Sequence, residues 1–519
     1  MRGKRCWEKT LMNKPIGLAA LLAALTVSTA SCVTSAAGPG TELAQLRPIA
    51  EVDERFQSYN VEMVEVTGGR FWAPYGGSAD EMYRQRPPEN LADPRLRALT
   101  KHLGPAYMRV SGTWANSTYL EAEDEDLSSP PPGYNQVLTR EQWRGAVDFA
   151  RAVDAEIGVS YAVSEGPRGP DGVWTTDQAQ RLLDLTRAAG GDLAFSEFIN
   201  EPNAASLGRL PKDYSVADYT RDFGIFKAWA QREAPSMKIV GPGGVGEGGD
   251  LSQIPVASLA KMLLTEQLMK ANPDAVDVVS YHFYGGVSQR CANTRAKKAD
   301  RGEALTPGWL DLTLRDWRYY SQLRDKYEPG DPMWVTETAQ AACGGSPWAT
   351  AFVDSFRYVN QLGLLAQKDV KVVFHNTLAA SDYSLIDEHT REPRPNYWAA
   401  ILWRRTMGTT VLASPSSPSP DLRIYAHCLP GGNGGVGLAA INLSESPHGL
   451  DLGAHARVWL MQSGSLDNKT VTVNGLTPRL EADGSLSGLG GAPASTSFAV
   501  PGRSIAFVAV SDAGNPACR

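Results

Sequence analysis

The chain has 519 residues, of which 42% are apolar and 21% charged, so it can bury the core of more than one domain. This composition excludes an intrinsically disordered protein. The formal net charge is −7, whereas proteins that bind nucleic acid through their general surface are basic. We therefore expect no nucleic-acid partner, and we expect any anionic ligand to be bound by a local basic site.

The N-terminal residues 1–37 have the pattern of an export signal. Basic residues come first, and the apolar run 16–27 and small residues that offer cleavage after Ala30 or Ala37 follow. About twelve apolar residues are too few to cross a bilayer. Without this leader, which holds five basic residues and one acidic residue, the net charge falls to −11. We expect a periplasmic or secreted protein, with anchoring as a lipoprotein through Cys32 as the alternative.

Four cysteines remain after cleavage beyond Cys32, an even number that favours two disulfides in an oxidising compartment. They are Cys291, Cys343, Cys428 and Cys518. Position along the chain suggests that the first pairs with the second and the third with the fourth, but the sequence leaves three connectivities open. A metal site is the alternative, and it would want a CxxC motif or a nearby pair of histidines. The chain has neither, so we expect no metal and no cofactor.

From about residue 56 to 400, short apolar strand-like runs alternate with amphipathic helical stretches. The eight predicted strands are 61–66, 106–112, 156–163, 194–200, 237–243, 276–284, 333–339 and 371–377. The predicted helices include 139–155, 175–190, 216–234 and 311–327, most with an Asp, Ser or Thr near the start. Eight such strands favour an α/β fold of the (β/α)8 TIM-barrel type over a doubly wound sheet. The doubly wound alternative would want a glycine-rich phosphate-binding turn after the first strand, and that turn is missing.

After about residue 400 the pattern changes to short strands separated by Gly, Pro and Asn turns. The Pro/Ser-rich segment 413–421 is typical of a linker or loop. We predict a C-terminal β-sandwich over 401–519, joined by an edge strand from 45–55, and we expect the protein to be a monomer.

Two glutamates, Glu197 and Glu201, lie in the stretch SEFINEPN at the end of the fourth predicted strand. Active sites of (β/α)8 barrels lie at the carboxyl ends of the strands. Glu201 has this place, between Asn200 and Pro202, whereas Glu197 lies inside the strand on the same face and is expected to support it. The alternative is that Glu201 merely begins a helix ahead of Pro202.

A second acid, Glu337, has the same setting 136 residues later, at the end of the seventh predicted strand. Strands four and seven face each other across the barrel mouth, so the two carboxylates can flank one bond. Glycoside hydrolysis with retention needs an acid/base and a nucleophile about 5 to 5.5 Å apart. The pair therefore predicts a glycoside hydrolase with Glu201 and Glu337 as its catalytic residues.

The motifs INEPN and TET around these acids resemble those of retaining glycosidases, above all glycoside hydrolase family 79, the heparanase and β-glucuronidase family. The likeness extends to the segments 92–113, 281–286, 382–403 and 422–444. It implies a retaining enzyme that cleaves β-linked glucuronic acid in glycosaminoglycans or other glucuronides. A non-catalytic glycan-binding protein on the same scaffold and a retaining glycosidase for another sugar are the alternatives.

The resemblance also implies roles for individual residues. Glu201 corresponds to the acid/base and Glu337 to the nucleophile. Asn200 resembles the residue that contacts the sugar 2-hydroxyl, and His282 and Tyr284 resemble the family's pair around the nucleophile.

Other positions resemble those that hold the rest of the sugar. Tyr383 resembles the tyrosine that helps to bind the uronate carboxylate, together with backbone amides around Cys343 and Gly344. Asn60 and Glu62, at the end of the first strand, match positions that touch the outer hydroxyls. The stretch AQAACGG lacks the tyrosine that animal heparanases carry after the nucleophile.

Three further features have two interpretations each. Trp114 and Trp174, in loops after the second and third strands, stack on sugar rings or simply pack. The run 290–300 is a solvated surface or a local positive patch for an anionic glycan. Glu247 stands where the family pattern has an amide.

Overall fold

The computed structural model describes residues 41–75, 81–204, 209–249, 262–291 and 297–519. The predicted export signal and Cys32 lie outside the described residues. Within the described part of the chain, no helix is long and apolar enough to cross a membrane.

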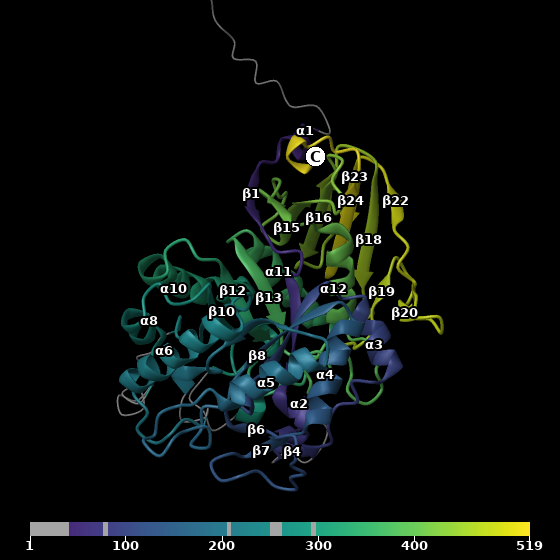
Figure 1. The fold of residues 1–519 in the computed structure, drawn as a ribbon. Coiled ribbons are helices and arrows are strands. Elements are labelled where there is room, and N and C mark those ends of the chain that lie inside the picture. The colour runs from purple at the N-terminus through teal and green to yellow at the C-terminus, as the bar shows by residue number, and fades with distance from the viewer. Residues whose placement is uncertain (1–40, 76–80, 205–208, 250–261, 292–296) are drawn as a thin grey trace, which may run out of the picture. The chain divides into compact units, whose positions relative to one another are not determined.

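Eight parallel strands close into a barrel (Figure 1). In ring order they are β2 (Gln57–Glu62), β5 (Ala106–Ser111), β8 (Ala155–Ser160), β9 (Leu193–Glu197), β10 (Lys238–Val245), β11 (Val278–Tyr284), β12 (Met333–Ala339) and β13 (Val370–His375). The predicted (β/α)8 barrel is confirmed.

Helices alternate with these strands along the chain. They are α2 (Met63–Thr67), α3 (Pro94–Lys101), α4 (Arg140–Ala152), α5 (Asp177–Ala188), α6 (Val216–Glu233), α8 (Thr265–Ala271), α9 (Pro307–Leu310), α10 (Leu312–Tyr327), α11 (Phe352–Ala366) and α12 (Pro395–Thr406). Thr139 and Ser215 cap α4 and α6 through their hydroxyl groups, which explains why polar residues marked these helix starts correctly.

Three predicted strands run well past the ends of the observed strands, and the third strand, predicted to continue to residue 163, ends at Ser160. The first was predicted at 61–66, but β2 ends at Glu62 and the apolar residues that follow form α2. A short apolar run does not distinguish a buried strand from a buried helix. The fourth was predicted to continue to residue 200, but β9 ends at Glu197 and residues 198–200 form a bend.

The barrel interior is layered from apolar to polar along the strands. Tyr107 and Phe195 belong to an apolar cluster at the amino ends, and two residues later the same strands carry Arg109 and Glu197. Side chains two apart on a strand point to the same side. The alternation therefore places the apolar cluster at the amino end of the barrel and the charged groups at its carboxyl end.

The C-terminal residues form a second sheet, which lies beside the barrel in Figure 1. Its order is β1 (Pro48–Glu51), β14 (Thr410–Leu412), β15 (Leu422–Cys428), β16 (Val436–Asn442), β24 (Ser504–Val510), β18 (Ala456–Gln462) and β19 (Thr472–Val473), and β22 (Ala492–Ala494) also pairs with β18. One face packs with residues of the two-stranded sheet β17 (His448–Asp451) and β23 (Ser497–Val500), and β16 and β24 contact α11 and α12. The segment before the barrel thus supplies an edge strand of this sheet. The boundary between the barrel and the C-terminal domain near residue 400 stays a prediction.

Two disulfides join Cys291 to Cys343 and Cys428 to Cys518, so the predicted pairing is confirmed. The first connects the loops that follow β11 and β12, and the second connects β15 to the C-terminus. Short strand pairs lie in two other loops: β3 (Gly69–Trp72) with β4 (Tyr83–Arg86), and β6 (Thr118–Leu120) with β7 (Gln136–Leu138). Two further short strands, β20 (Arg479–Leu480) and β21 (Leu486–Ser487), pair in the C-terminal part.

Candidate active site

Arg109 organises the charged layer at the mouth of the barrel. Its side chain is 1% exposed, and it donates hydrogen bonds to Glu197 Oε2 at 2.8 Å, Glu337 Oε2 at 3.1 Å and Asn200 Oδ1 at 2.8 Å. A buried cation with several carboxylate and amide acceptors fixes their positions, because each bond is charge-assisted. One side chain on β5 therefore sets the place of groups from β9, β12 and the loop after β9.

Glu197 supports this arrangement from inside the barrel, as predicted from its place in the strand. Its Oε1 accepts hydrogen bonds from Ser280 at 2.9 Å and Thr336 at 2.7 Å. Burial raises the pKa of the Glu197 carboxyl, but the charges of Arg109 and His282 and the hydrogen bond from Thr336 outweigh burial and hold the pKa below its usual value. Glu197 thus stays ionised and neutralises Arg109.

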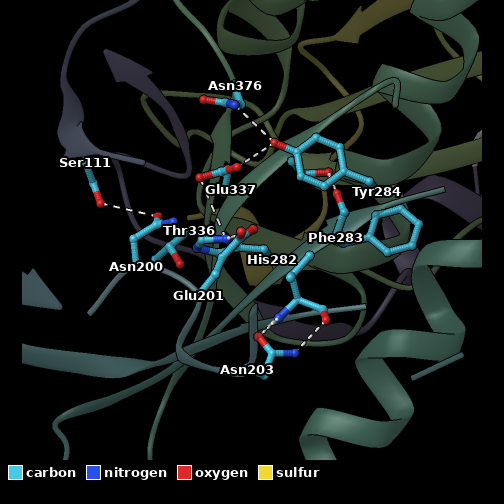
Figure 2. A network of polar contacts seen from close by, with 12 residues as sticks. Ser111, Asn200, Glu201, Asn203, His282, Phe283, Tyr284, Thr336, Glu337 and Asn376 are labelled. Carbon is cyan, nitrogen blue, oxygen red and sulfur yellow. Dashed lines mark hydrogen bonds and ion pairs between the residues drawn. The ribbon is translucent and has the colours of Figure 1, made fainter. Parts of the chain in front are cut away.

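Glu337 lies in β12, two residues before its end, and both of its carboxylate oxygens accept hydrogen bonds. The Tyr284 hydroxyl donates to Glu337 Oε1 at 2.6 Å (Figure 2). Arg109 donates to Glu337 Oε2. Burial first, then the charge of Glu337, raises the pKa of Tyr284 well above its usual range, so its hydroxyl keeps its proton. A carboxylate fixed in this way has the geometry of a nucleophile.

Glu201 lies four residues beyond β9 and not at the strand end, as had been expected. Its φ angle is +51°, a left-handed conformation that is uncommon for residues other than glycine, and the turn Pro202–Ala204 follows it. Asn116 holds the bend by accepting from the Asn200 amide at 3.1 Å and donating to the Asn200 carbonyl at 2.9 Å. The bend turns the Glu201 side chain toward the mouth of the barrel, where it is 16% exposed.

His282 connects the two acids. Its Nδ1 lies 3.0 Å from Glu201 Oε1 and 3.7 Å from Glu337 Oε2. Its Nε2 faces Arg109, which can only donate, so Nδ1 carries the hydrogen that Glu201 accepts. Burial lowers the pKa of His282. The charge of Glu337 and the hydrogen bond to Glu201 raise it by more than burial lowers it, so the pKa lies above its usual value.

The two acids come close enough to act on one bond. One oxygen each of Glu201 and Glu337 and one nitrogen of His282 all lie within 4.8 Å of one another. Three such atoms could also hold a cation. The His282 nitrogen, however, already donates to Glu201, which favours acid/base chemistry over metal binding at this site.

A second group of polar residues lies beside the nucleophile, around Asn376. Its Nδ2, which has two hydrogens to donate, lies within hydrogen-bond distance of three acceptors: the hydroxyl groups of Tyr284 at 3.0 Å and Tyr383 at 3.1 Å, and Glu62 Oε1 at 3.2 Å. Burial, together with the charge of Glu337, raises the pKa of Glu62 well above its usual value. A protonated carboxyl can donate to a sugar hydroxyl as well as accept from one.

Asn60 also belongs to the group of polar residues around Asn376. It donates to the Thr336 carbonyl at 3.2 Å. Asn60 Oδ1, Glu62 Oε2 and Asn376 Oδ1 are buried and have no hydrogen-bond partner among the described residues. Buried acceptors without a partner are costly, and a ligand with hydroxyl groups would satisfy them.

The loop after β12 carries Cys343 and Gly344, both with positive φ. Among the described residues, neither of their backbone N–H groups has an acceptor. Arg290 stabilises the loop, because it donates to the carbonyls of Cys343 at 3.2 Å and Gly345 at 2.7 Å and forms an ion pair with Asp382. A side chain at Gly344 would collide with Trp72 and Ser381, so the close approach requires glycine.

The structure decides the interpretation of Trp174 and leaves both interpretations of Trp114 open. Trp174 is 1% exposed and packs against Phe198, so it belongs to the core and not to a sugar platform. Trp114 is half-buried and keeps an exposed part. Arg290 is buried, whereas Lys297 in the same run is exposed and pairs with Glu303, and residues 292–296 lie outside the described residues.

Glu247 does not touch any of these groups. It accepts from the Thr265 amide at 2.9 Å, and burial raises its pKa to about 7.

Two polar residues of the site, Arg109 and Asn376, were not predicted from the sequence. A charged residue inside the apolar run AYMRVSG was a usable signal for Arg109, because a buried charge needs a partner. Nothing in the sequence distinguished Asn376.

No family model matches the chain. Heparanase-like protein 1 of Arabidopsis thaliana is 31% identical over 371 residues, which cover 69% of this chain and 65% of that protein. Heparanase of Bos taurus is 26% identical over 536 residues, which cover 91% of each chain.

Among solved structures, α-L-arabinofuranosidase from Thermotoga maritima matches with a TM-score of 0.60 and 15% identity over 89% of this chain and 98% of that one. Similarity at this level of identity shows a common fold only. The sequence relatives are more specific. The chain is thus a homologue of heparanases and heparanase-like proteins, and its predicted resemblance to glycoside hydrolase family 79 is confirmed.

Proposed function

We propose that this protein is a retaining glycoside hydrolase that cleaves β-linked glucuronic acid. The observation that carries the proposal is the approach of Glu201 and Glu337 to within 4.8 Å, oxygen to oxygen. Inverting enzymes need room for a water between their carboxyl groups and separate them by roughly 6.5–9.5 Å. The short separation supports double displacement. A glycan-binding protein without catalytic activity would not need two convergent acids.

The first step is attack on the anomeric carbon by a Glu337 oxygen. The bond to the leaving oxygen breaks as Glu201 gives it a proton, and a covalent glycosyl-enzyme forms. Tyr284 and Arg109 hold the attacking carboxylate in place during this step. His282 holds Glu201 and is itself fixed by Arg109, which keeps the acid oriented toward the leaving group.

The second step is hydrolysis of the covalent intermediate. Glu201, now ionised, accepts a proton from a water molecule that attacks the anomeric carbon and releases Glu337. Asn200 receives a hydrogen bond from Arg109 next to the acid. We assign its amide to the sugar 2-hydroxyl, a contact that strengthens in such transition states.

The uronate carboxylate is assigned to the loop after β12. The N–H groups of Cys343 and Gly344, which have no acceptor among the described residues, and the hydroxyl of Tyr383 offer donors for it. Burial raises the pKa of Tyr383 well above its usual range, so its hydroxyl remains a donor. The unpaired acceptors of Asn60 and Glu62 are assigned to the outer hydroxyls.

Hydrolysis of an aryl β-glucuronide, compared with an aryl β-glucoside and an aryl α-L-arabinofuranoside, tests the proposal. We expect turnover of the glucuronide alone, and a loss of at least about a hundredfold in Glu201→Ala and Glu337→Ala with the fold intact. Turnover of the glucuronide by Glu337→Ala at the normal rate would show that the nucleophile is wrong. Preference for the arabinofuranoside would reject the substrate.

Digestion of heparan sulfate and hyaluronan with product sizing then separates two modes of action. Free glucuronate indicates release from a chain end, and shortened chains indicate internal cleavage. We also propose that the enzyme acts outside the cytoplasm, since two disulfides persist in an oxidising compartment.

A further inference from the structure

Asn203 lies two residues after Glu201 and bonds to the backbone of a neighbouring strand. It is 1% exposed. Its Nδ2 donates to the Val245 carbonyl at 2.8 Å, and its Oδ1 accepts from the Val245 amide at 3.0 Å. Figure 2 shows both bonds of Asn203. One side chain thus occupies both backbone hydrogen-bonding groups of a residue of β10, and the mechanism above gives it no role.

Asn203 takes the place of a missing strand at this point of the barrel. β9 ends at Glu197, and the last residue of β10 that pairs with β9 is Val240. β10 itself continues to Val245. Backbone groups near the core need partners, and the amide of an asparagine offers the same donor and acceptor as a peptide group. The Asn203 side chain therefore extends the contact between the β9 loop and β10 beyond the end of β9.

This contact closes a ring that contains Glu201. Val245 pairs in register with His282 of β11, and His282 Nδ1 lies 3.0 Å from Glu201 Oε1. Asn203 belongs to the turn after Glu201, in which the Ala204 amide donates to the Glu201 carbonyl at 2.9 Å. The backbone and the carboxyl group of Glu201 are therefore both fixed against the adjacent strands β10 and β11.

A second asparagine holds the chain on the other side of Glu201. Asn116 makes the same kind of reciprocal contact, with the amide and the carbonyl of Asn200. Between the two asparagine contacts, Glu201 keeps its φ of +51°. A left-handed conformation of this kind persists only where the surrounding structure fixes it. Loss of the Asn203 contact would let the backbone at Glu201 relax and move its carboxyl group away from the leaving oxygen.

Glu201 has to keep its place in two protonation states. It is protonated when the leaving oxygen departs and ionised when water attacks. Its hydrogen bond with His282 differs in strength between these states, because a bond to an ionised acceptor is stronger than a bond to a neutral one. The contact of Asn203 with Val245 involves no titratable group, so it is the same in both steps.

We propose that Asn203 is a positioning residue for the acid/base. Its two bonds to Val245 hold Glu201 where it can protonate the leaving oxygen in the first step and activate water in the second. The inference rests on the proposed glucuronidase function and on the role of Glu201 in it. Asn203 acts through Glu201 and not on the sugar, so its loss impairs proton transfer and leaves sugar binding intact.

The test measures how the loss of Asn203 depends on the leaving group. Asn203→Ala is compared with the full-length wild type on a phenyl and a dinitrophenyl β-glucuronide. Departure of phenol needs a proton from Glu201, whereas dinitrophenolate departs without one. The matched control is Asn474→Ala, because Asn474 accepts from the Leu460 amide at 3.0 Å and donates to the Val458 carbonyl at 2.8 Å in the C-terminal sheet.

We expect kcat/KM for the phenyl substrate to fall about 10- to 100-fold in Asn203→Ala, since a misplaced general acid loses rate of this order. For the dinitrophenyl substrate, kcat/KM should stay within about threefold of the wild type. Its kcat and KM should fall together, because slower hydrolysis lets the covalent intermediate accumulate. Asn474→Ala should match the wild type on both substrates.

An equal fall in kcat/KM on both substrates would overturn the inference, because it would show general damage to the site. Unchanged kinetics on both substrates would also overturn it. If Asn203→Ala does not unfold in one cooperative transition, Asn203→Ser takes its place, since its hydroxyl can keep one of the two bonds, and the same outcomes decide. These outcomes leave the proposed function standing, whereas failure of the wild type to cleave either β-glucuronide would reject the proposed function itself.

Discussion

Replacement of Tyr284 by phenylalanine tests whether the nucleophile depends on its hydrogen bonds. The change removes one hydroxyl group, which donates to Glu337 Oε1 at 2.6 Å. Hydrogen bonds to an ionised partner contribute about 1.5–3 kcal/mol. Asn376 keeps its two other acceptors, Glu62 and Tyr383, so the surrounding network survives. At about 1.4 kcal/mol for each factor of ten, kcat/KM for an aryl β-glucuronide should fall about 10- to 150-fold.

Tyr281→Phe is a matched control on the same strand, β11, because the Tyr281 hydroxyl is buried and has no hydrogen-bond partner among the described residues. Steady-state kinetics and thermal unfolding would be measured for both variants. We expect normal activity in Tyr281→Phe and a single cooperative unfolding transition in Tyr284→Phe, which shows that this variant is folded. Activity of Tyr284→Phe within twofold of the wild type would refute the role given to this contact.

Three further predictions concern stability and metals. Burial raises the Glu247 pKa from 4.5 to about 7, so the folded state binds more protons than the unfolded state in this window and stability falls as the pH rises through it. Glu247→Gln should remove this fall and gain up to about 3 kcal/mol at pH 8, measured by denaturant unfolding at pH 4.5 and 8; an unchanged pH dependence would contradict the burial argument. Replacing Cys428 and Cys518 by alanine opens a loop of 90 residues and should lower the free energy of unfolding by about 4 kcal/mol, whereas a cost below about 1 kcal/mol would contradict the constraint. Treatment with a strong chelator should leave glucuronide turnover unchanged, and a loss restored by added metal would show that Glu201, His282 and Glu337 hold an ion.

The catalytic pair could be found from the sequence because barrel topology converts strand ends into neighbours. Glu201 and Glu337 are far apart along the chain, yet each follows an apolar run, and the barrel places both at one end. The same logic predicted the support by Glu197. The strand order also shows β9 and β12 separated by β10 and β11, so the side chains converge without being directly opposite.

Other parts of the site could not be predicted because they depend on packing between distant segments. Arg109 joins groups from three other parts of the barrel, and no local pattern specifies such partners. The bend at residues 198–200 was missed because buried loop residues look like a strand in sequence. The burial of Trp174 and Arg290 likewise follows from tertiary contacts and not from their exposed-looking loops.

The central claim is that Glu337 becomes covalently bonded to the sugar. A 2-deoxy-2-fluoro-β-glucuronyl fluoride slows hydrolysis of the intermediate more than its formation, so the glycosyl-enzyme should accumulate and be detected by mass spectrometry of the digested protein. We predict one label per chain, on the peptide that contains Glu337, with loss of activity in parallel. A label on Glu201, or inactivation without any label on Glu337, would contradict the account.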